Sequence, residues 1–145
     1  MAEDIDHITA VFCPPAGAEV VGPALSFLEE TLCEALVDLL PVPARVQGWG
    51  FFDSADGGEH TAVVMLIDSP GLAEAQRVVR RMVELSGVAA SRDHGFMPHL
   101  TCGYLPRGTR PPDLPLVDAS FSIGEVRLVG GREVAVRPGH PLVAT

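Results

Sequence analysis

Apolar residues recur at helical spacing in two stretches of the chain. The first covers residues 23–40 and ends where Pro41 follows, because proline cannot continue a helix. The second covers residues 70–86; Pro70 occupies the first turn, where a missing N–H group costs nothing, and Gly87 marks the end. Charged residues lie between the apolar ones in each stretch, which predicts two amphipathic helices.

Alternating or short continuous apolar runs predict strands in the rest of the chain. The expected strands cover residues 5–12, 44–53, 61–67, 100–105, 117–123, 125–129 and 133–137. A turn signal at residues 53–58 separates the second strand from the third and predicts a hairpin. Because strands and helices do not alternate strictly, the expected fold class is α+β, and 145 residues fit a single domain.

Two short segments far apart in the chain share one pattern. His7-Ile8-Thr9 and His99-Leu100-Thr101 both place threonine two residues after histidine. In both, an aromatic residue follows the histidine by five positions and a proline by seven. Either segment alone is most simply a half-buried histidine beside a β-favouring threonine. Two copies with matching aromatic and proline positions indicate a weak internal duplication, and they make the repeated residues candidates for a functional site.

The spacing defines the chemistry that such a pair offers. On a strand, residues i and i+2 point to the same face about 7 Å apart, so each segment presents an imidazole beside a hydroxyl. Imidazole exchanges protons near neutral pH, and a hydroxyl donates to a phosphate oxygen without adding charge. If the two strands are neighbours, two imidazoles flank one phosphate. One can then take the proton of the nucleophile while the other protonates the leaving oxygen, and no metal is required.

Composition narrows the class of ligand and the compartment. The 10 Lys and Arg residues against 19 Asp and Glu give a net charge of -9, so the chain lacks the cationic surface that holds long nucleic acid. A small anionic ligand held by a few groups stays compatible with this charge. Three cysteines without paired spacing predict free thiols in a reducing compartment. The sequence shows neither a secretory leader nor an apolar run of about 20 residues, so we expect a cytoplasmic protein without membrane contact.

The two motifs resemble the H-x-T/S-x signatures of the 2H phosphoesterase superfamily, the LigT-like group that includes RNA 2',3'-cyclic phosphodiesterases, often named 2'-5' RNA ligases. The matching segments are His7-Ile8-Thr9-Ala10 and Pro98-His99-Leu100-Thr101-Cys102, and residues 65–72 and 126–129 add to the likeness. The resemblance implies a bilobal α+β fold in which two pseudo-symmetric antiparallel sheets, flanked by helices, surround a central cleft. Residues 1–145 would form one such domain, with pseudo-repeat halves at about 1–67 and 68–145.

By position, the resemblance implies that His7 and His99 form the acid–base pair and that Thr9 and Thr101 hold the substrate phosphate. The implied activity is cleavage of cyclic or 2'-5' phosphodiester bonds without metal or cofactor. The acidic charge favours a small nucleotide, such as a 2',3'-cyclic phosphate end or a cyclic di- or oligonucleotide signal. Which histidine is the base stays open, as does the oligomeric state.

The chain departs from the superfamily at its start. Only six residues precede His7, whereas superfamily members usually carry a strand and a helix before the first motif. One lobe is therefore expected to lack a strand, which leaves a sheet edge to be covered or paired in another way. This departure changes the expected architecture but leaves both motifs in place.

Further residues are candidates for a base-stacking or cleft position. Trp49 and Phe52 lie on a predicted strand and could stack a base, although core packing is the default for both. Tyr104 faces away from the histidine by strand parity, unless the strand ends or bulges before it. His94 precedes the second motif and could border the cleft. The candidate phosphate contacts are Arg45, Arg92 and Arg107.

Two alternatives use the same residues differently. A module of this fold could bind and sequester a nucleotide without turnover. A zinc site built from His94, His99 and Cys102 is a further alternative, although zinc sites usually draw on paired ligands. Turnover in the presence of EDTA separates the enzyme from the binding module, and metal analysis tests the zinc site.

Overall fold

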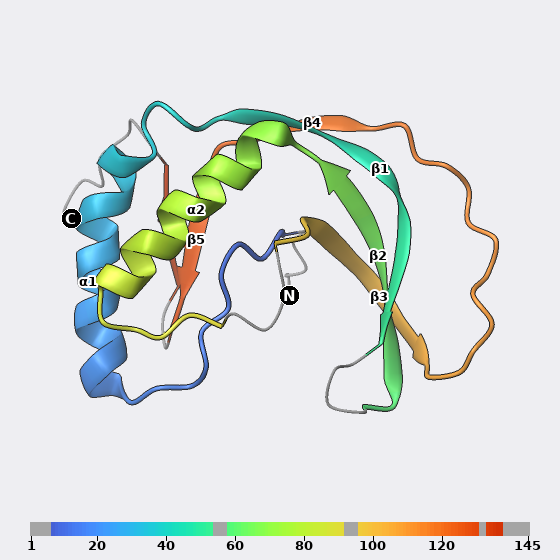
Figure 1. Cartoon of the computed structure of the whole chain (residues 1–145), viewed down its shortest axis with the longest axis horizontal. Coiled ribbons are helices and arrows are strands. Elements are labelled where there is room, and N and C mark those ends of the chain that lie inside the picture. The colour runs from blue at the N-terminus through green and yellow to red at the C-terminus, as the bar shows by residue number, and fades with distance from the viewer. Residues whose placement is uncertain (1–6, 54–57, 92–95, 131–132, 138–145) are drawn as a thin grey trace. The chain divides into compact units, whose positions relative to one another are not determined.

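The computed structural model describes residues 7–53, 58–91, 96–130 and 133–137 (Figure 1). The helices are α1 (Ala18–Ala35) and α2 (Pro70–Leu85). The strands are β1 (Val42–Asp53), β2 (His60–Asp68), β3 (His99–Pro106), β4 (Ser120–Ile123), β5 (Val126–Val129) and β6 (Glu133–Val136). They form a four-stranded sheet of order β3-β2-β1-β4 and a two-stranded sheet of β5 and β6, so the predicted α+β class is confirmed. The two sheets are unequal in size, unlike the pseudo-symmetric pair that we expected.

Two compact units make up the chain, and each is assembled from separate segments. Among the described residues, unit 1 comprises 7–9, 44–53, 58–69 and 97–121, and unit 2 comprises 10–43, 70–91, 96, 122–130 and 133–137. These units do not coincide with the halves 1–67 and 68–145, because each unit takes segments from both. Both H-x-T segments therefore belong to unit 1.

Unit 1 is built on long, curved strands (Figure 1). β2 pairs antiparallel with β1 on one side and with β3 on the other, and its apolar run fits this central position. β4 adds at the edge of β1, where the Val46 N–H donates to the Ala119 carbonyl oxygen at 3.0 Å. The register shifts by one residue at Gln47 in β1 and at Cys102 in β3. Such bulges bend a strand and increase its twist.

Unit 2 is a helical core against a small sheet. α1 packs against both α2 and β6. Buried apolar side chains recur every three or four residues along both helices; they are Ala24, Leu25, Leu28 and Leu32 in α1, and Leu72, Ala75, Val79 and Val83 in α2. Leu32 and Val136 are fully enclosed. The apolar stripe that predicts each helix is thus the stripe that forms this core.

The first helix differs from the prediction at both ends. It covers Ala18–Ala35, so Pro23 lies inside it rather than at its start. Beyond its end the chain forms a turn in which the Leu40 N–H donates to the Leu36 carbonyl oxygen at 3.1 Å, and both leucines stay buried. Because the residue before a proline disfavours the helical conformation, Pro41 explains why this turn does not continue beyond Leu40.

The strand predicted over residues 5–12 is wrong for the part of it that the structure describes, because residues 7–17 form neither helix nor strand. Backbone groups of this segment bond to α2 and to the residues after it, not to a neighbouring strand. The Ala10 carbonyl accepts a hydrogen bond of 3.1 Å from Gln76 Nε2, and the Phe12 carbonyl accepts one of 2.8 Å from a backbone N–H after α2. Pro14 and Pro15 follow one residue later and cannot donate to a sheet ladder.

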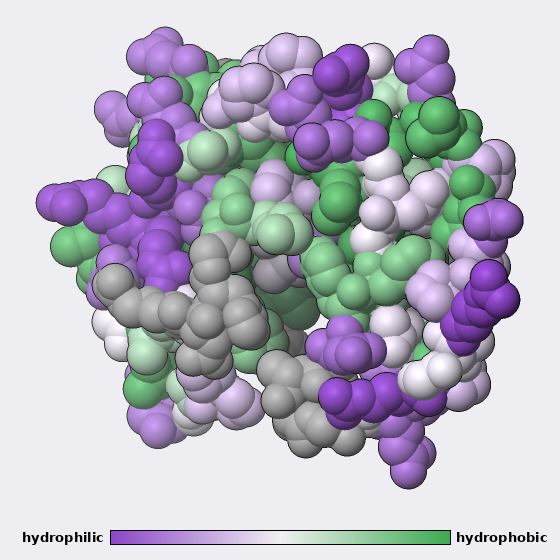
Figure 2. Space-filling model, turned by 45° about the vertical axis from the view of Figure 1, so that its right-hand side comes forward, coloured by the Kyte–Doolittle hydropathy of each residue, from purple (hydrophilic) through white to green (hydrophobic). Residues whose placement is uncertain are grey.

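Polar and apolar residues are interspersed over the drawn surface (Figure 2). Within the described part of the chain, no helix has the length and apolar character that crossing a membrane requires. All three cysteines are free thiols, and Cys13 and Cys33 are half-buried. Burial raises the pKa of the Cys13 thiol, and the nearby Arg80 opposes this effect only in part, so the thiol stays protonated near neutral pH.

Candidate functional site

β3 carries the second H-x-T motif on one face of the four-stranded sheet. Residues opposite one another in an antiparallel pair share a face, so the register defines which side chains surround the motif. Three cross-strand rows result: Gly48, Leu66 and His99; Gly50, Val64 and Thr101; Phe52, Ala62 and Tyr104. We call these nine residues the His99 face. His99 and Thr101 thus lie on adjacent rows of one face, as their spacing predicts.

The His99 ring is held by two contacts. Its Nδ1 lies 2.7 Å from the Met97 carbonyl oxygen. A carbonyl can only accept, so Nδ1 carries the proton and Nε2 presents the lone pair in the neutral ring. The Phe52 ring meets the imidazole edge to face, with ring centroids 5.1 Å apart and an interplanar angle of 80°. These two contacts fix the orientation of the ring. The His99 side chain is only half-buried, so the ring is not enclosed in the core.

Two glycines leave β1 without side chains beside the motif. Gly48 and Gly50 occupy the first two rows, so β1 presents no side chain there. A Cβ at Gly48 would meet nothing within 4 Å, whereas one at Gly50 would come to 3.2 Å from Val64 Cγ2. With no side chain at either position, the Phe52 ring can reach diagonally across the sheet to His99. Sequence reasoning missed these glycines, although their alternating spacing was the signal.

The first motif lies in the same unit but not on a strand. Residues 7–9 belong to unit 1 together with β2 and β3. The side chains of His7 and Thr9 are exposed, and so is that of Thr101. Because these residues do not form a strand, their two-residue spacing does not place the His7 and Thr9 side chains on one face. All four motif residues are nevertheless in one unit, and none is sealed in the hydrophobic interior.

A bulge in β3 changes the direction of Tyr104. Thr101 pairs with Val64 and Gly103 pairs with the adjacent Val63, so Cys102 is an extra residue in the register. Beyond it the alternation of β3 is inverted, and Tyr104 pairs with Ala62 on the His99 face. The expectation from strict parity, that Tyr104 faces away from the histidine, is wrong for this reason.

The other candidate residues have different placements. Phe52 is on the His99 face, whereas Trp49 pairs with Met65 on the opposite face. There the Trp49 indole Nε1–H donates to the Pro115 carbonyl oxygen at 2.8 Å, in the proline-rich loop after β3. The structure thus separates Trp49 from the motif. His94 lies outside the described residues.

Charged groups border the face at both ends. Arg45 pairs with Asp68 in the register, next to the His99 row, and its Nε lies 3.1 Å from Asp68 Oδ2. Both side chains are well exposed. At the hairpin end, the Arg107 guanidinium Nη1 donates to the Gly58 carbonyl oxygen at 3.4 Å, and the Arg107 backbone N–H donates to the Glu59 carbonyl oxygen at 2.7 Å. The third candidate phosphate contact, Arg92, lies outside the described residues.

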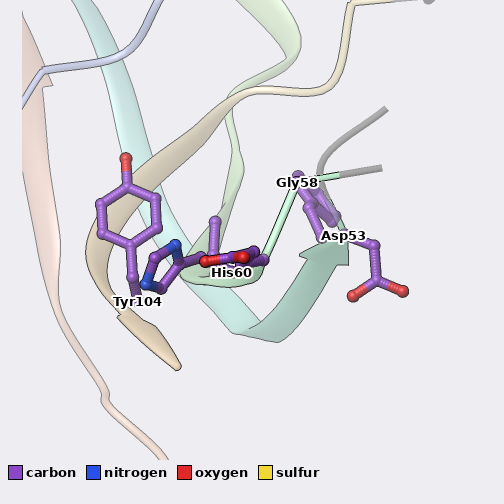
Figure 3. A pocket seen from close by; sticks show the side chains of 7 residues that line it. Asp53, Gly58, His60 and Tyr104 are labelled. Atoms are coloured by element: carbon purple, nitrogen blue, oxygen red, sulfur yellow. The ribbon is translucent and has the colours of Figure 1, made fainter. Parts of the chain in front are cut away.

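A cavity of about 610 Å³ adjoins the Tyr104 row. Its lining residues are Phe52, Asp53, Gly58, Glu59, His60, Ala62 and Tyr104, all from unit 1. The imidazole of His60 lies beside the Tyr104 ring, and the Asp53 carboxylate points away from both (Figure 3). Asp53 Oδ1 accepts a hydrogen bond of 2.5 Å from Thr61 Oγ1. The cavity therefore has an aromatic wall, and it shares Phe52 with His99.

Among the described residues, no group of three or more His, Cys, Asp and Glu side chains is placed so that it could hold a metal ion. Cys102 Sγ donates to the Leu100 carbonyl oxygen at 3.6 Å. His94, the other ligand of the zinc alternative with His99, is outside the described residues.

Comparison with known proteins shows a structure of similar fold and indicates no activity. No family model matches the chain, and no curated protein matches it in sequence. The crystal structure of TT0787 of Thermus thermophilus is similar, with a TM-score of 0.59 over 93% of this chain and 80% of that chain, at 17% sequence identity. A likeness at this identity establishes a shared fold and transfers no activity.

Proposed function

We propose that the protein is a LigT-like 2H phosphoesterase that hydrolyses cyclic or 2'-5' phosphodiester bonds of small nucleotides. The observation that carries this proposal is the pair of contacts on His99, which leave Nε2 as the proton-exchanging atom of a half-buried imidazole. The repeated H-x-T motif supplies a second imidazole, His7, in the same unit. The net charge of -9 favours a small nucleotide over a long RNA.

In the proposed reaction, water attacks phosphorus and the bond from phosphorus to one ribose oxygen breaks. One imidazole takes a proton from the attacking water, and the other, initially protonated, gives its proton to the leaving oxygen. The product is a phosphomonoester, and the two imidazoles end with their protonation states exchanged. For His99, the exchanging atom is Nε2 in either role, because Nδ1 keeps its proton on the Met97 carbonyl. The hydroxyls of Thr9 and Thr101 donate to the phosphate oxygens.

The test is turnover of 2',3'-cyclic nucleotides and cyclic dinucleotides in EDTA, followed by chromatography of the products. His7→Ala and His99→Ala should each lower kcat by about 100-fold or more, the usual effect of removing a positioned acid or base. Thr9→Val and Thr101→Val should cost less, because each removes one donor to the phosphate. His140→Ala, which removes a histidine outside both motifs, is the matched control and should retain full activity.

Two results would contradict the proposal. The first is turnover near the unmodified level in both motif histidine variants. The second is tight binding of a nucleotide without any product, which would identify a sequestering module built on the same face.

A further inference from the structure

We propose that the cavity beside Tyr104 is a nucleobase site, and that it prefers bases carrying an amino group over uracil. This inference rests on the proposed function, because it assumes that the phosphate lies at His99 and Thr101. Tyr104 would be the stacking surface and Glu59 the hydrogen-bond acceptor. Three features of the structure support the assignment.

The first feature is position. Thr101 and Tyr104 occupy adjacent rows of the His99 face. Adjacent rows are about 7 Å apart, because two residues of a strand separate them. That spacing matches the reach from a phosphate to the base of the same nucleotide. Phe52 lines the cavity and also contacts the His99 ring, so one side chain borders both proposed subsites.

The second feature is the aromatic surface. The Tyr104 side chain is 67% exposed, although an exposed ring of this size costs free energy in water. The bulge at Cys102 turns this ring onto the face that carries the motif. A base stacked on it would bury the ring, and every base has a π-face that suits such stacking. The His60 imidazole, beside Tyr104, stands at the same wall (Figure 3).

The third feature is charge. Among the described residues, Asp53 and Glu59 line the cavity and no lysine or arginine does. The Arg107 guanidinium lies beside it, where Nη1 donates to the carbonyl oxygen of the lining residue Gly58 at 3.4 Å, so two carboxylates stand against one cation. Carboxylates repel a phosphate, so this end of the face suits the uncharged part of a nucleotide. The Asp53 carboxylate points away and accepts from Thr61, which leaves Glu59 as the lining carboxylate for a ligand.

A carboxylate accepts hydrogen bonds and donates none. Guanine, adenine and cytosine present amino donors on their pairing edges, and carboxylates accept from such groups in nucleic-acid recognition. Uracil presents one N–H between two carbonyl oxygens, and these oxygens are repelled by the carboxylate oxygens. Of the four bases, we therefore expect uracil to bind this cavity with the lowest affinity.

The experiment measures kcat and KM for the four 2',3'-cyclic mononucleotides, together with their equilibrium binding by calorimetry. Tyr104→Ala should raise KM and the dissociation constant about tenfold or more, with kcat changed less than threefold, because stacking is lost and the chemistry is not. Tyr104→Phe keeps the ring and should restore wild-type values. Glu59→Gln should reduce the preference for amino-bearing bases over uracil about tenfold, because the amide presents a donor as well as an acceptor.

Leu116→Ala is the matched control. Leu116 is 88% exposed in unit 1 and follows Pro115, whose carbonyl bonds to Trp49 on the opposite face. Its truncation should leave all constants unchanged. Because Tyr104 and Glu59 are exposed, their variants should have the same melting temperature as the parent protein.

The outcomes separate this inference from the proposed function. Binding without turnover that weakens in Tyr104→Ala refutes the phosphodiesterase and supports the base site. Turnover with equal constants for all four bases, unchanged by Tyr104→Ala, refutes the base site and supports the phosphodiesterase. Absence of both binding and turnover overturns both.

Discussion

The two glycines of β1 offer a matched pair of substitutions that tests the described sheet face. Gly48 and Gly50 lie two residues apart on one strand and on one face, so Gly48→Ala and Gly50→Ala differ only in what the new methyl group meets. At position 48 it meets nothing within 4 Å. At position 50 it comes to 3.2 Å from Val64 Cγ2 and 3.3 Å from Leu66 Cδ2.

These contacts set the expected magnitudes. Replacing glycine by alanine at a compatible position stabilises a protein by about 0.4–1 kcal/mol, because the unfolded chain loses freedom. Gly48→Ala should show this gain in the free energy of unfolding. At Gly50 the same gain is opposed by overpacking, which costs about 1–3 kcal/mol in a well-packed region. Val64 is fully buried and has little room to move, so Gly50→Ala should be net destabilising by about 0.5–2 kcal/mol.

The assay is urea unfolding of both variants and the parent protein, with thermal melts as a second measurement. For a chain of this size, about 1 kcal/mol corresponds to a shift of roughly 4 °C in Tm. The expected order of stability is Gly48→Ala, parent, Gly50→Ala. Equal stability of the two variants would refute the placement of Gly50 against Val64, and with it the register that defines the His99 face.

Two further predictions concern single side chains. Trp49→Phe should lower the free energy of unfolding by about 1 kcal/mol, because the hydrogen bond to the loop is lost, yet leave turnover unchanged; a loss of activity at equal stability would place Trp49 in the site. Glu125→Gln should cost up to about 1 kcal/mol near neutral pH, because Arg137 first and Arg127 second lower the pKa of Glu125 in the folded state through hydrogen bonds. That stabilisation is present above the ordinary pKa of a glutamate and is lost as the pH falls through the lowered pKa of Glu125. The free energies of unfolding of parent and variant, measured in urea, should therefore become equal in acid. A difference that persists there would contradict the assignment.

Most of the helices and strands could be predicted from hydrophobic periodicity. The second helix begins at Pro70 as its sequence indicates, and β2 covers the continuous apolar run. The hairpin between β1 and β2 was also predicted, from the turn residues between them. In these elements local propensity and tertiary packing favour the same conformation, so the sequence pattern is sufficient.

The segment around His7 could not be predicted in the same way. Its alternating pattern fits a strand, but a strand also needs a partner, and the backbone of Ala10 and Phe12 bonds to Gln76 of α2 and to Ser91 instead. Alternation reports which residues can form a strand and says nothing about the available partner. For the same reason, local patterns do not reveal which distant segments pack into one unit. Unit 1 is such a case, because it combines residues 7–9, 44–53, 58–69 and 97–121.

The candidate site was predictable in its motif residues and less so in its surroundings. The spacing of His99 and Thr101 fixes their shared face once β3 forms. The direction of Tyr104 depends on the bulge at Cys102, which no residue type marks in the sequence. The contact between Phe52 and His99 depends on the curvature of the sheet and on two glycines. Features that arise from pairing across strands are therefore the ones that the sequence alone leaves open.

The most direct test of the two-imidazole mechanism is a crystal structure with a phosphomonoester product nucleotide bound. The mechanism requires phosphate oxygens within hydrogen-bond distance, about 2.6–3.2 Å, of a ring nitrogen of His7 and of Nε2 of His99. We also expect the Thr9 and Thr101 hydroxyls to contact the same phosphate. A phosphate that binds elsewhere, or that touches His99 while His7 stays beyond the reach of a hydrogen bond or one bridging water, would contradict the two-imidazole mechanism.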